Sequence, residues 1–270
     1  METHRPPRIR PPAVAGTFYP ARAGELREAV GRYLAQAAAS TRSDPSHPKA
    51  LIVPHAGYIY SGPVAASGYA RLAQAGDTVK RVVLIGPAHY LAIRGVAASG
   101  ADAFATPLGE VPVDRGAIAG LGDLPQVAVR DDAHRREHCL EVQLPFLQMV
   151  LAQFAIVPLL VGAAGDDEVR QVIDRLWGGP ETLILISSDL SHYHDSATAR
   201  GLDAATAAAI EALAPERIGD QRACGRIPIA GLLLSARARG LRAVTADLRN
   251  SGDTAGPHGE VVGYGAFLLA

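Results

Sequence analysis

Histidines follow three apolar segments that have the length and composition of buried strands. His55 follows the run LIVP, His89 follows VVLIGPA, and LILISS precedes both Asp189 and His192. A single histidine after a strand is more often a hydrogen-bonding loop residue than a metal ligand. The repetition at three strand ends makes a ligand role more plausible, because the carboxyl ends of parallel strands converge at one edge of an α/β sheet. The pattern therefore predicts that these side chains meet and form a metal site.

Cys224 stands at the start of a segment, CGRIPIAGLLLSARARG, that reads as a helix. A thiol at the positive end of a helix dipole has a lowered pKa, which favours the thiolate that binds metal or attacks carbon. The alternative is a small buried apolar residue, which is the usual role of a free cysteine. With two histidines and one open position, the thiolate would complete a site for Fe(II), copper or zinc.

The segment REHCLEVQLPFLQ adds Glu137, His138 and Glu141, and the last two are three residues apart and would share one face of a helix. They could support the ligands as a carboxylate partner or act as a general acid or base. The alternative is an ordinary helix start, with glutamate near its positive end. The remaining histidines of the polar stretches, His4, His47 and His134, are predicted to lie on the surface.

Strand-like and helix-like segments alternate along the chain and must position these residues. The predicted strands are 50–54, 81–86, 95–99, 126–130, 155–161, 182–187, 242–248 and 261–269. The predicted helices are 25–38, 63–75, 140–153, 167–177, 198–213 and 224–239. Continuous apolar strands indicate a sheet covered on both faces, so we expect an α/β fold with a mixed, mostly parallel central sheet.

One domain over residues 1–270 is the expected organisation, with 1–12 as a flexible lead-in and 40–48 as a surface loop. The net charge is -1, from 26 basic and 27 acidic residues, which argues against a nucleic-acid binder. No apolar run reaches the roughly 18 residues that span a bilayer. The two cysteines come without a recognisable secretion signal, so we expect a cytoplasmic protein with free thiols.

Seven motifs, in order along nearly the whole chain, resemble the Memo family, named AmmeMemoRadiSam system protein B in prokaryotes. They are VAGTFYP, PHAGYIYSG, LIGPAHY, REHCLEVQLPFLQ, SSDLSHYH, CGRIP and VVGYGAFLL. This family is similar in fold to the LigB-like class III extradiol dioxygenases, which use non-haem Fe(II). The resemblance implies a mixed α/β sheet with the site at its strand ends.

By this resemblance, His55, His89 and Cys224 fall on the metal-binding positions of the family. Asp189 and His192 fall on polar pocket positions, with His192 in the place of the acid–base histidine of the dioxygenases. The implied function is that of a redox protein that binds Fe(II) or copper and acts on a small molecule in the manner of a dioxygenase. The thiol in place of the carboxylate ligand of the dioxygenases argues against ring cleavage.

Two alternatives stay open at this point. One is a metal- or peptide-binding partner without turnover, associated with a radical-SAM protein and an AMMECR-type protein, as the prokaryotic family name implies. The other is a metal-free thiol hydrolase with Cys224 as nucleophile, His192 as base and Asp189 orienting the base. The hydrolase ranks below the others because it leaves His55 and His89 without a function.

Overall fold

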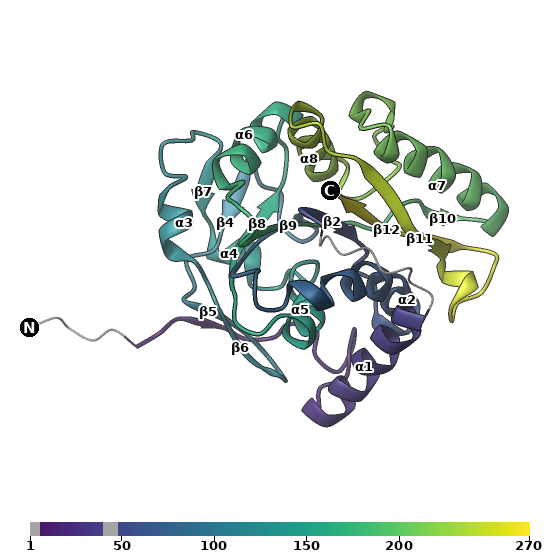
Figure 1. Cartoon of the computed structure of the whole chain (residues 1–270), viewed down its shortest axis with the longest axis horizontal. Coiled ribbons are helices and arrows are strands. Elements are labelled where there is room, and N and C mark those ends of the chain that lie inside the picture. The colour runs from purple at the N-terminus through teal and green to yellow at the C-terminus, as the bar shows by residue number, and fades with distance from the viewer. Residues whose placement is uncertain (1–5, 40–47) are drawn as a thin grey trace, which may run out of the picture.

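The computed structural model describes residues 6–39 and 48–270, and a large mixed sheet forms its centre (Figure 1). Its strands are rich in Val, Ile and Leu, and the central ones are buried along their whole length because helices cover both faces. In this part of the chain the strands of the large sheet are β2 (Ala50–Val53), β3 (Arg81–Pro87), β4 (Val96–Ala98), β7 (Val127–Val129), β8 (Ala155–Val161), β9 (Thr182–Ser187), β10 (His192–His194), β11 (Ala243–Asn250) and β12 (Val261–Leu269).

The strand order is β10-β12-β2-β9-β3-β8-β4-β7, and β11 pairs with β12 beside this path. Strands β2, β9, β3 and β8 run parallel to one another, so their carboxyl ends meet at one edge. The joins of β12 with β2 and of β4 with β8 are antiparallel. The predicted mixed α/β sheet is confirmed, and its four-stranded parallel centre carries the predicted site.

Helices lie on both sides of this sheet. The described ones are α1 (Ala23–Ala39), α2 (Tyr58–Tyr69), α3 (Arg115–Ala119), α4 (Asp131–His134), α5 (Leu144–Val150), α6 (Asp166–Leu176), α7 (Ser196–Glu211) and α8 (Arg226–Ala238), with 3-10 turns η1 (Ala70–Ala75), η2 (Glu141–Gln143), η3 (Pro215–Arg217) and η4 (Ser251–Asp253). Figure 1 shows α1, α2 and α5 together on one side and α6, α7 and α8 on the other. None of the described helices combines the length and the apolarity that a membrane span needs.

Two predicted helices differ from the structure near the site. Helix α2 begins at Tyr58 rather than at 63, and Pro63 lies inside it. The carbonyl that Pro63 leaves without a helical partner belongs to Ile59, an exposed residue, where water can satisfy it. The predicted helix 140–153 is shorter, running through η2 into α5. Pro145 lies in the first turn of α5, where its missing N–H costs little.

The lead-in prediction is wrong for the described residues after position 5. Strand β1 (Ile9–Arg10) pairs in parallel with β5 (Ala103–Thr106), which forms a hairpin with β6 (Gly109–Pro112). Arg10 is buried, so this segment is part of the packed structure. Residues 1–5 and the predicted loop residues 40–47 lie outside the described residues.

Candidate metal centre

Three imidazoles meet at the carboxyl edge of the parallel strands. His55 lies two residues after β2, His89 two residues after β3, and His138 in the segment before η2. Each offers a ring nitrogen, and these ligand atoms lie within 4.8 Å of one another. The ring centroids are 5.1 Å apart for His55 and His89, 5.5 Å for His55 and His138, and 4.8 Å for His89 and His138. This group could hold a metal ion.

The Glu137 carboxylate organises two of the three rings. Its Oε1 accepts a hydrogen bond from Nδ1 of His89 at 2.9 Å, and its Oε2 accepts one from the His89 backbone N–H at 2.7 Å. The backbone N–H groups of His138 and Cys139 also donate to Oε1, at 3.0 and 3.1 Å. Because an ionised carboxylate only accepts, Nδ1 of His89 carries a hydrogen, and in the neutral ring this leaves the lone pair on Nε2.

The charge on Glu137 is stabilised although its side chain is only 2% exposed. Burial by itself raises the pKa of this carboxyl, but the neighbouring imidazoles of His138 and His89 hold the pKa well below its usual range. Nδ1 of His138 lies 3.2 Å from Oε1 of Glu137, and this buried nitrogen makes no hydrogen bond with the described residues. Glu137 is nevertheless its close charged neighbour, so the carboxylate contacts both His89 and His138.

His55 is the most buried of the three ligand candidates, at 2% exposure. Burial lowers the pKa of its imidazole to about 4, so the ring is neutral near pH 7 and able to bind a cation. Its Nδ1 lies 2.9 Å from Oγ of Ser187, and its backbone N–H donates to Oδ1 of Asp189 at 2.7 Å. Ser187 ends β9 and Asp189 follows it, so the neighbouring parallel strand fixes both the ring and the backbone of His55.

Cys224 lies beside His55, with its Sγ 3.3 Å from Nε2 of the ring. The backbone N–H of Asp189 donates to the same sulfur at 3.3 Å, and Gly225 N–H donates to Oγ of Ser188 at 2.9 Å. These bonds join the loop before α8 to the end of β9. Of the three residues that the sequence predicted as ligands, His55 and His89 belong to one group of ligand atoms, whereas the Cys224 sulfur contacts His55 and lies outside that group.

The predicted low pKa of Cys224 is wrong for the protein without metal. Burial, reinforced by the nearby Asp189 carboxylate, raises the pKa of this thiol to about 12. The thiol precedes α8 by two residues, but loss of hydration outweighs the favourable helix terminus. A thiolate at this position therefore needs a compensating cation, because a bound metal ion displaces the thiol proton.

Glu141 has a different place from the one predicted. Its buried carboxylate forms an ion pair with the buried guanidinium of Arg10. It also accepts hydrogen bonds from the Tyr19 hydroxyl at 2.6 Å and from the backbone N–H groups of Ala13 and Val14, at 2.7 and 3.0 Å. Its oxygens thus hold the segment 10–19 in place, and this segment brings the Phe18 ring to 4.7 Å from the ring of His138.

Two other histidines lie apart from the ligand group. His192, in β10, packs against Tyr193 with ring centroids 5.8 Å apart, and it lies near the buried Asp203 carboxylate. In the described part of the chain it is not among the residues whose ligand atoms meet. The surface prediction for His134 is wrong: it is buried, and Nε2 lies 3.0 Å from the Ala97 carbonyl oxygen. His4 and His47 lie outside the described residues.

A cavity of about 480 Å³ opens beside the thiol. Cys224 lines it together with Pro87 at the end of β3, Val161 at the end of β8, and apolar side chains such as Leu91 and Ile227. Its size falls in the range of small-molecule sites. It therefore gives the sulfur edge of the cluster a place where a small ligand fits.

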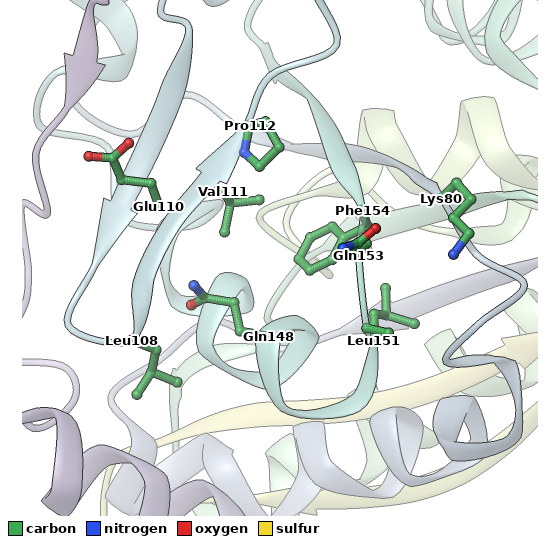
Figure 2. Close-up of a pocket in the computed structure, with 10 residues that line it drawn as sticks. Lys80, Leu108, Glu110, Val111, Pro112, Gln148, Leu151, Gln153 and Phe154 are labelled. Atoms are coloured by element: carbon green, nitrogen blue, oxygen red, sulfur yellow. The ribbon is translucent and has the colours of Figure 1, made fainter.

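A second cavity lies at the opposite end of the same strands (Figure 2). Its lining includes Lys80, which directly precedes β3, and Phe154, which directly precedes β8. The volume is about 620 Å³. Because it lies at the amino edge of the parallel strands, it is separate from the histidine cluster.

Sequence reasoning named Glu137 but gave it no role, and it missed two further polar residues beside the ligands, Ser187 and Gln143. Ser187 is the last residue of a buried strand, and Gln143 interrupts the apolar stripe that includes Leu140, Leu144 and Leu147. A polar residue in an otherwise apolar buried pattern needs a hydrogen-bond partner. This interruption of an apolar pattern was visible in the sequence at Ser187 and Gln143, but it does not show which residue each of them bonds to.

Fold and site together define a class of protein: an α/β protein with a histidine and thiol cluster at the carboxyl edge of a mixed sheet. A family model described as "Memo-like protein" matches residues 10–268. The chain belongs to the Memo family, and the resemblance seen in the sequence motifs is confirmed.

Curated relatives named "MEMO1 family protein" match the chain over nearly its whole length. The relative from Aquifex aeolicus is 35% identical over 269 residues, which cover 95% of this chain and 97% of the relative. Those from Ignicoccus hospitalis and Thermotoga maritima are 37% and 36% identical, covering 96% of this chain and 97% and 99% of their own.

A solved structure also shares the fold. It is the crystal structure of an uncharacterized protein from Escherichia coli K12, with a TM-score of 0.54 and 12% sequence identity. The match covers 83% of this chain and all of the other chain. At this identity the likeness concerns the fold alone.

Proposed function

We propose that this protein binds a redox-active metal ion, Fe(II) or copper, and acts on a small molecule beside it. The observation that carries the proposal is the meeting of three imidazole ligand atoms within 4.8 Å of one another, with the Cys224 sulfur 3.3 Å from Nε2 of His55. His55, His89 and Cys224 would hold the ion, and His138 would add a third imidazole. A nitrogen and sulfur donor set suits iron, copper and zinc.

The cluster fits a cation for two reasons that do not depend on the family. Three imidazole ligand atoms converge within 4.8 Å of one another, and Glu137 places a buried negative charge 2.9 Å from Nδ1 of His89 and 3.2 Å from Nδ1 of His138. A bound cation would offset that charge and would stabilise the Cys224 thiolate, which is otherwise protonated. The ion would supply Lewis-acid and redox chemistry when bound.

The protein itself would orient the ligands and admit the substrate. Glu137 holds the proton on Nδ1 of His89, and Asp189 fixes the backbone of His55. The cavity lined by Cys224 offers room for a small molecule next to the sulfur, which favours an enzyme over a binding protein. We assign proton movement to His192, which is partly exposed and lies near the buried Asp203 carboxylate.

Metal content of purified variants tests the assignment. Protein prepared without oxygen and loaded with Fe(II) or Cu(I) should bind one ion per chain. His55→Ala, His89→Ala and Cys224→Ser should each lose most of it. His134→Gln is the matched control, because this histidine is also buried but bonds to the Ala97 carbonyl. Unchanged metal content in the three ligand variants would contradict the site.

Oxygen uptake separates enzyme from binding protein. Metal-loaded protein should consume oxygen with some small phenolic or thiol compounds from a panel, and His192→Ala should slow this without loss of metal. A fully loaded protein that never turns over would instead favour the second role, metal binding or delivery within an assembly with radical-SAM and AMMECR-type partners.

A further inference from the structure

A chain of buried polar side chains runs behind His55, away from the ligand cluster. The Tyr69 hydroxyl donates to Oε1 of Gln143 at 2.7 Å, and Nε2 of Gln143 donates to Oγ of Ser187 at 2.7 Å. Oγ of Ser187 lies 2.9 Å from Nδ1 of His55. All four side chains are 2% exposed or less. In such surroundings each donor and acceptor needs a partner, so the positions of the hydrogens can be deduced.

The amide of Gln143 is fixed by two neighbours of opposite character. The Pro54 carbonyl oxygen, which can only accept, lies 3.0 Å from Nε2. On the other side the Tyr69 hydroxyl donates to Oε1. A flipped amide would set its oxygen against the Pro54 carbonyl, so the NH₂ group must face Pro54 and Ser187. One of its hydrogens goes to each of them.

The Ser187 hydroxyl has a single hydrogen, and it donates this hydrogen to the backbone. Its Oγ donates to the carbonyl oxygen of Cys139 at 2.6 Å. Because Gln143 already donates to this Oγ, only an acceptor lone pair remains for His55. Nδ1 of His55 must then be the donor. Its Nε2, which lies 3.3 Å from the Cys224 sulfur, then carries a lone pair that faces the thiol and becomes available to a metal ion when the thiol proton is lost.

We propose that Gln143 is a positioning residue for His55: through Ser187 it selects the imidazole tautomer whose Nε2 is free to bind the metal ion. The inference rests on the proposed metal centre and adds a residue that touches neither the ion nor the ligand ring. Gln143 is thus the neutral counterpart of Glu137, whose negative charge favours the same tautomer at His89. Hydrogen bonds to the far nitrogen of a ligand histidine fix its orientation and raise its basicity.

The tautomer can be measured without any metal. Long-range ¹H–¹⁵N correlation spectra of the metal-free protein at pH 7 distinguish protonated Nδ1 from protonated Nε2, and His55→Gln identifies the signals of His55 among the nine histidines. The expected result is a neutral ring with hydrogen on Nδ1. Hydrogen on Nε2 of His55 would overturn the proposal, whether or not the protein binds metal.

Variants then test whether Gln143 controls this state. Gln143→Met keeps the length of the side chain but removes both hydrogens, so Ser187 is free to turn its hydroxyl toward His55. We expect both tautomers in the spectrum and a metal affinity lower by about tenfold, at the small end of the effect of such partners. Ser187→Ala, which removes the acceptor itself, should cost more, up to about a hundredfold.

The matched control is Gln148→Met on α5. Gln148 is also bonded through both ends of its amide, to Thr106 and the Gly109 carbonyl, but it borders the cavity at the opposite edge of the sheet (Figure 2). This variant should leave the tautomer and the affinity unchanged. A normal tautomer and normal affinity in folded Gln143→Met or Ser187→Ala would overturn the proposal. Failure of the wild type to bind metal would defeat the metal centre alone, because the tautomer is read in the metal-free protein.

Discussion

Glu137 and Glu141 are buried carboxylates four residues apart, yet they belong to different parts of the molecule. Glu141 pairs with a full cation, Arg10, and accepts from Tyr19 and two backbone N–H groups. In the described residues, the side-chain partners of Glu137 are the imidazoles of His89 and His138. One carboxylate thus has its charge balanced within the protein, whereas the other faces rings that can bind a cation.

The difference shows that the partner, and not the residue type or burial, decides what a buried carboxylate does. A guanidinium with backbone donors makes a structural anchor, here for the segment 10–19. Imidazole partners make a carboxylate that orients ligand rings and leaves a negative potential for a metal ion. Exchanging each glutamate for glutamine should therefore produce opposite patterns of stability and metal affinity.

Glu141→Gln should have the largest effect on stability. It leaves the Arg10 guanidinium buried without its counter-charge, and breaking such a pair typically costs about 3–5 kcal/mol. Urea denaturation of the metal-free protein measures the free energy of unfolding. Metal affinity of the folded variant should stay close to that of the wild type. A loss below about 1 kcal/mol would mean that Glu141 is not an anchor.

Of the two glutamine variants, Glu137→Gln should have the larger effect on metal binding. The amide keeps the size of the side chain but lacks the charge that holds the proton on Nδ1 of His89, so affinity should fall by about 10–100-fold. Competition with a coloured chelator measures this change. Glu141→Gln is the control on the same segment. If the two variants lost metal affinity equally, the division between anchor and ligand partner would be wrong.

Acid should weaken both regions through their buried histidines. Burial lowers the pKa of His55 and of His134 from 6.5 to about 4, so below pH 6.5 the unfolded chain binds more protons than the folded one. The free energy of unfolding should therefore fall between pH 6.5 and 4, by at most about 1.4 kcal/mol per pH unit for each ring.

His134 belongs to the anchor region, because its carbonyl accepts from Nε of Arg10. His134→Gln should remove one of the two contributions and make the pH dependence shallower. Unfolding curves at pH 7, 6 and 5 provide the measurement. An unchanged slope in the variant would show that His134 is already protonated when folded, or that it is not buried in solution.

The sequence predicted the parts of this site that follow regular strands. His55 and His89 come directly after short apolar runs, and the parallel pairing of β2, β9, β3 and β8 brings those ends together. Cys224 was placed at the start of α8, and the family resemblance joined it to the two histidines. Strand periodicity and motif order are local features of the sequence, so a single sequence was enough to predict where these residues lie relative to the strands and helices.

The irregular segment 137–143 could not be read in the same way. Its spacing predicted a helix with His138 and Glu141 on one face, but the chain turns through η2, and the two side chains take different partners. The pKa of Cys224 was also misjudged, because dehydration depends on what covers the thiol and not on its place before a helix. Both errors concern contacts between distant parts of the chain, which no local pattern records.

The measurement that tests the metal centre most directly is X-ray absorption at the metal edge, on anaerobically prepared protein loaded with one ion per chain. The account predicts imidazole scattering together with one sulfur at a bonded distance of about 2.3 Å, and loss of that sulfur in Cys224→Ser. A coordination sphere of oxygen atoms alone, identical in wild type and Cys224→Ser, would contradict it.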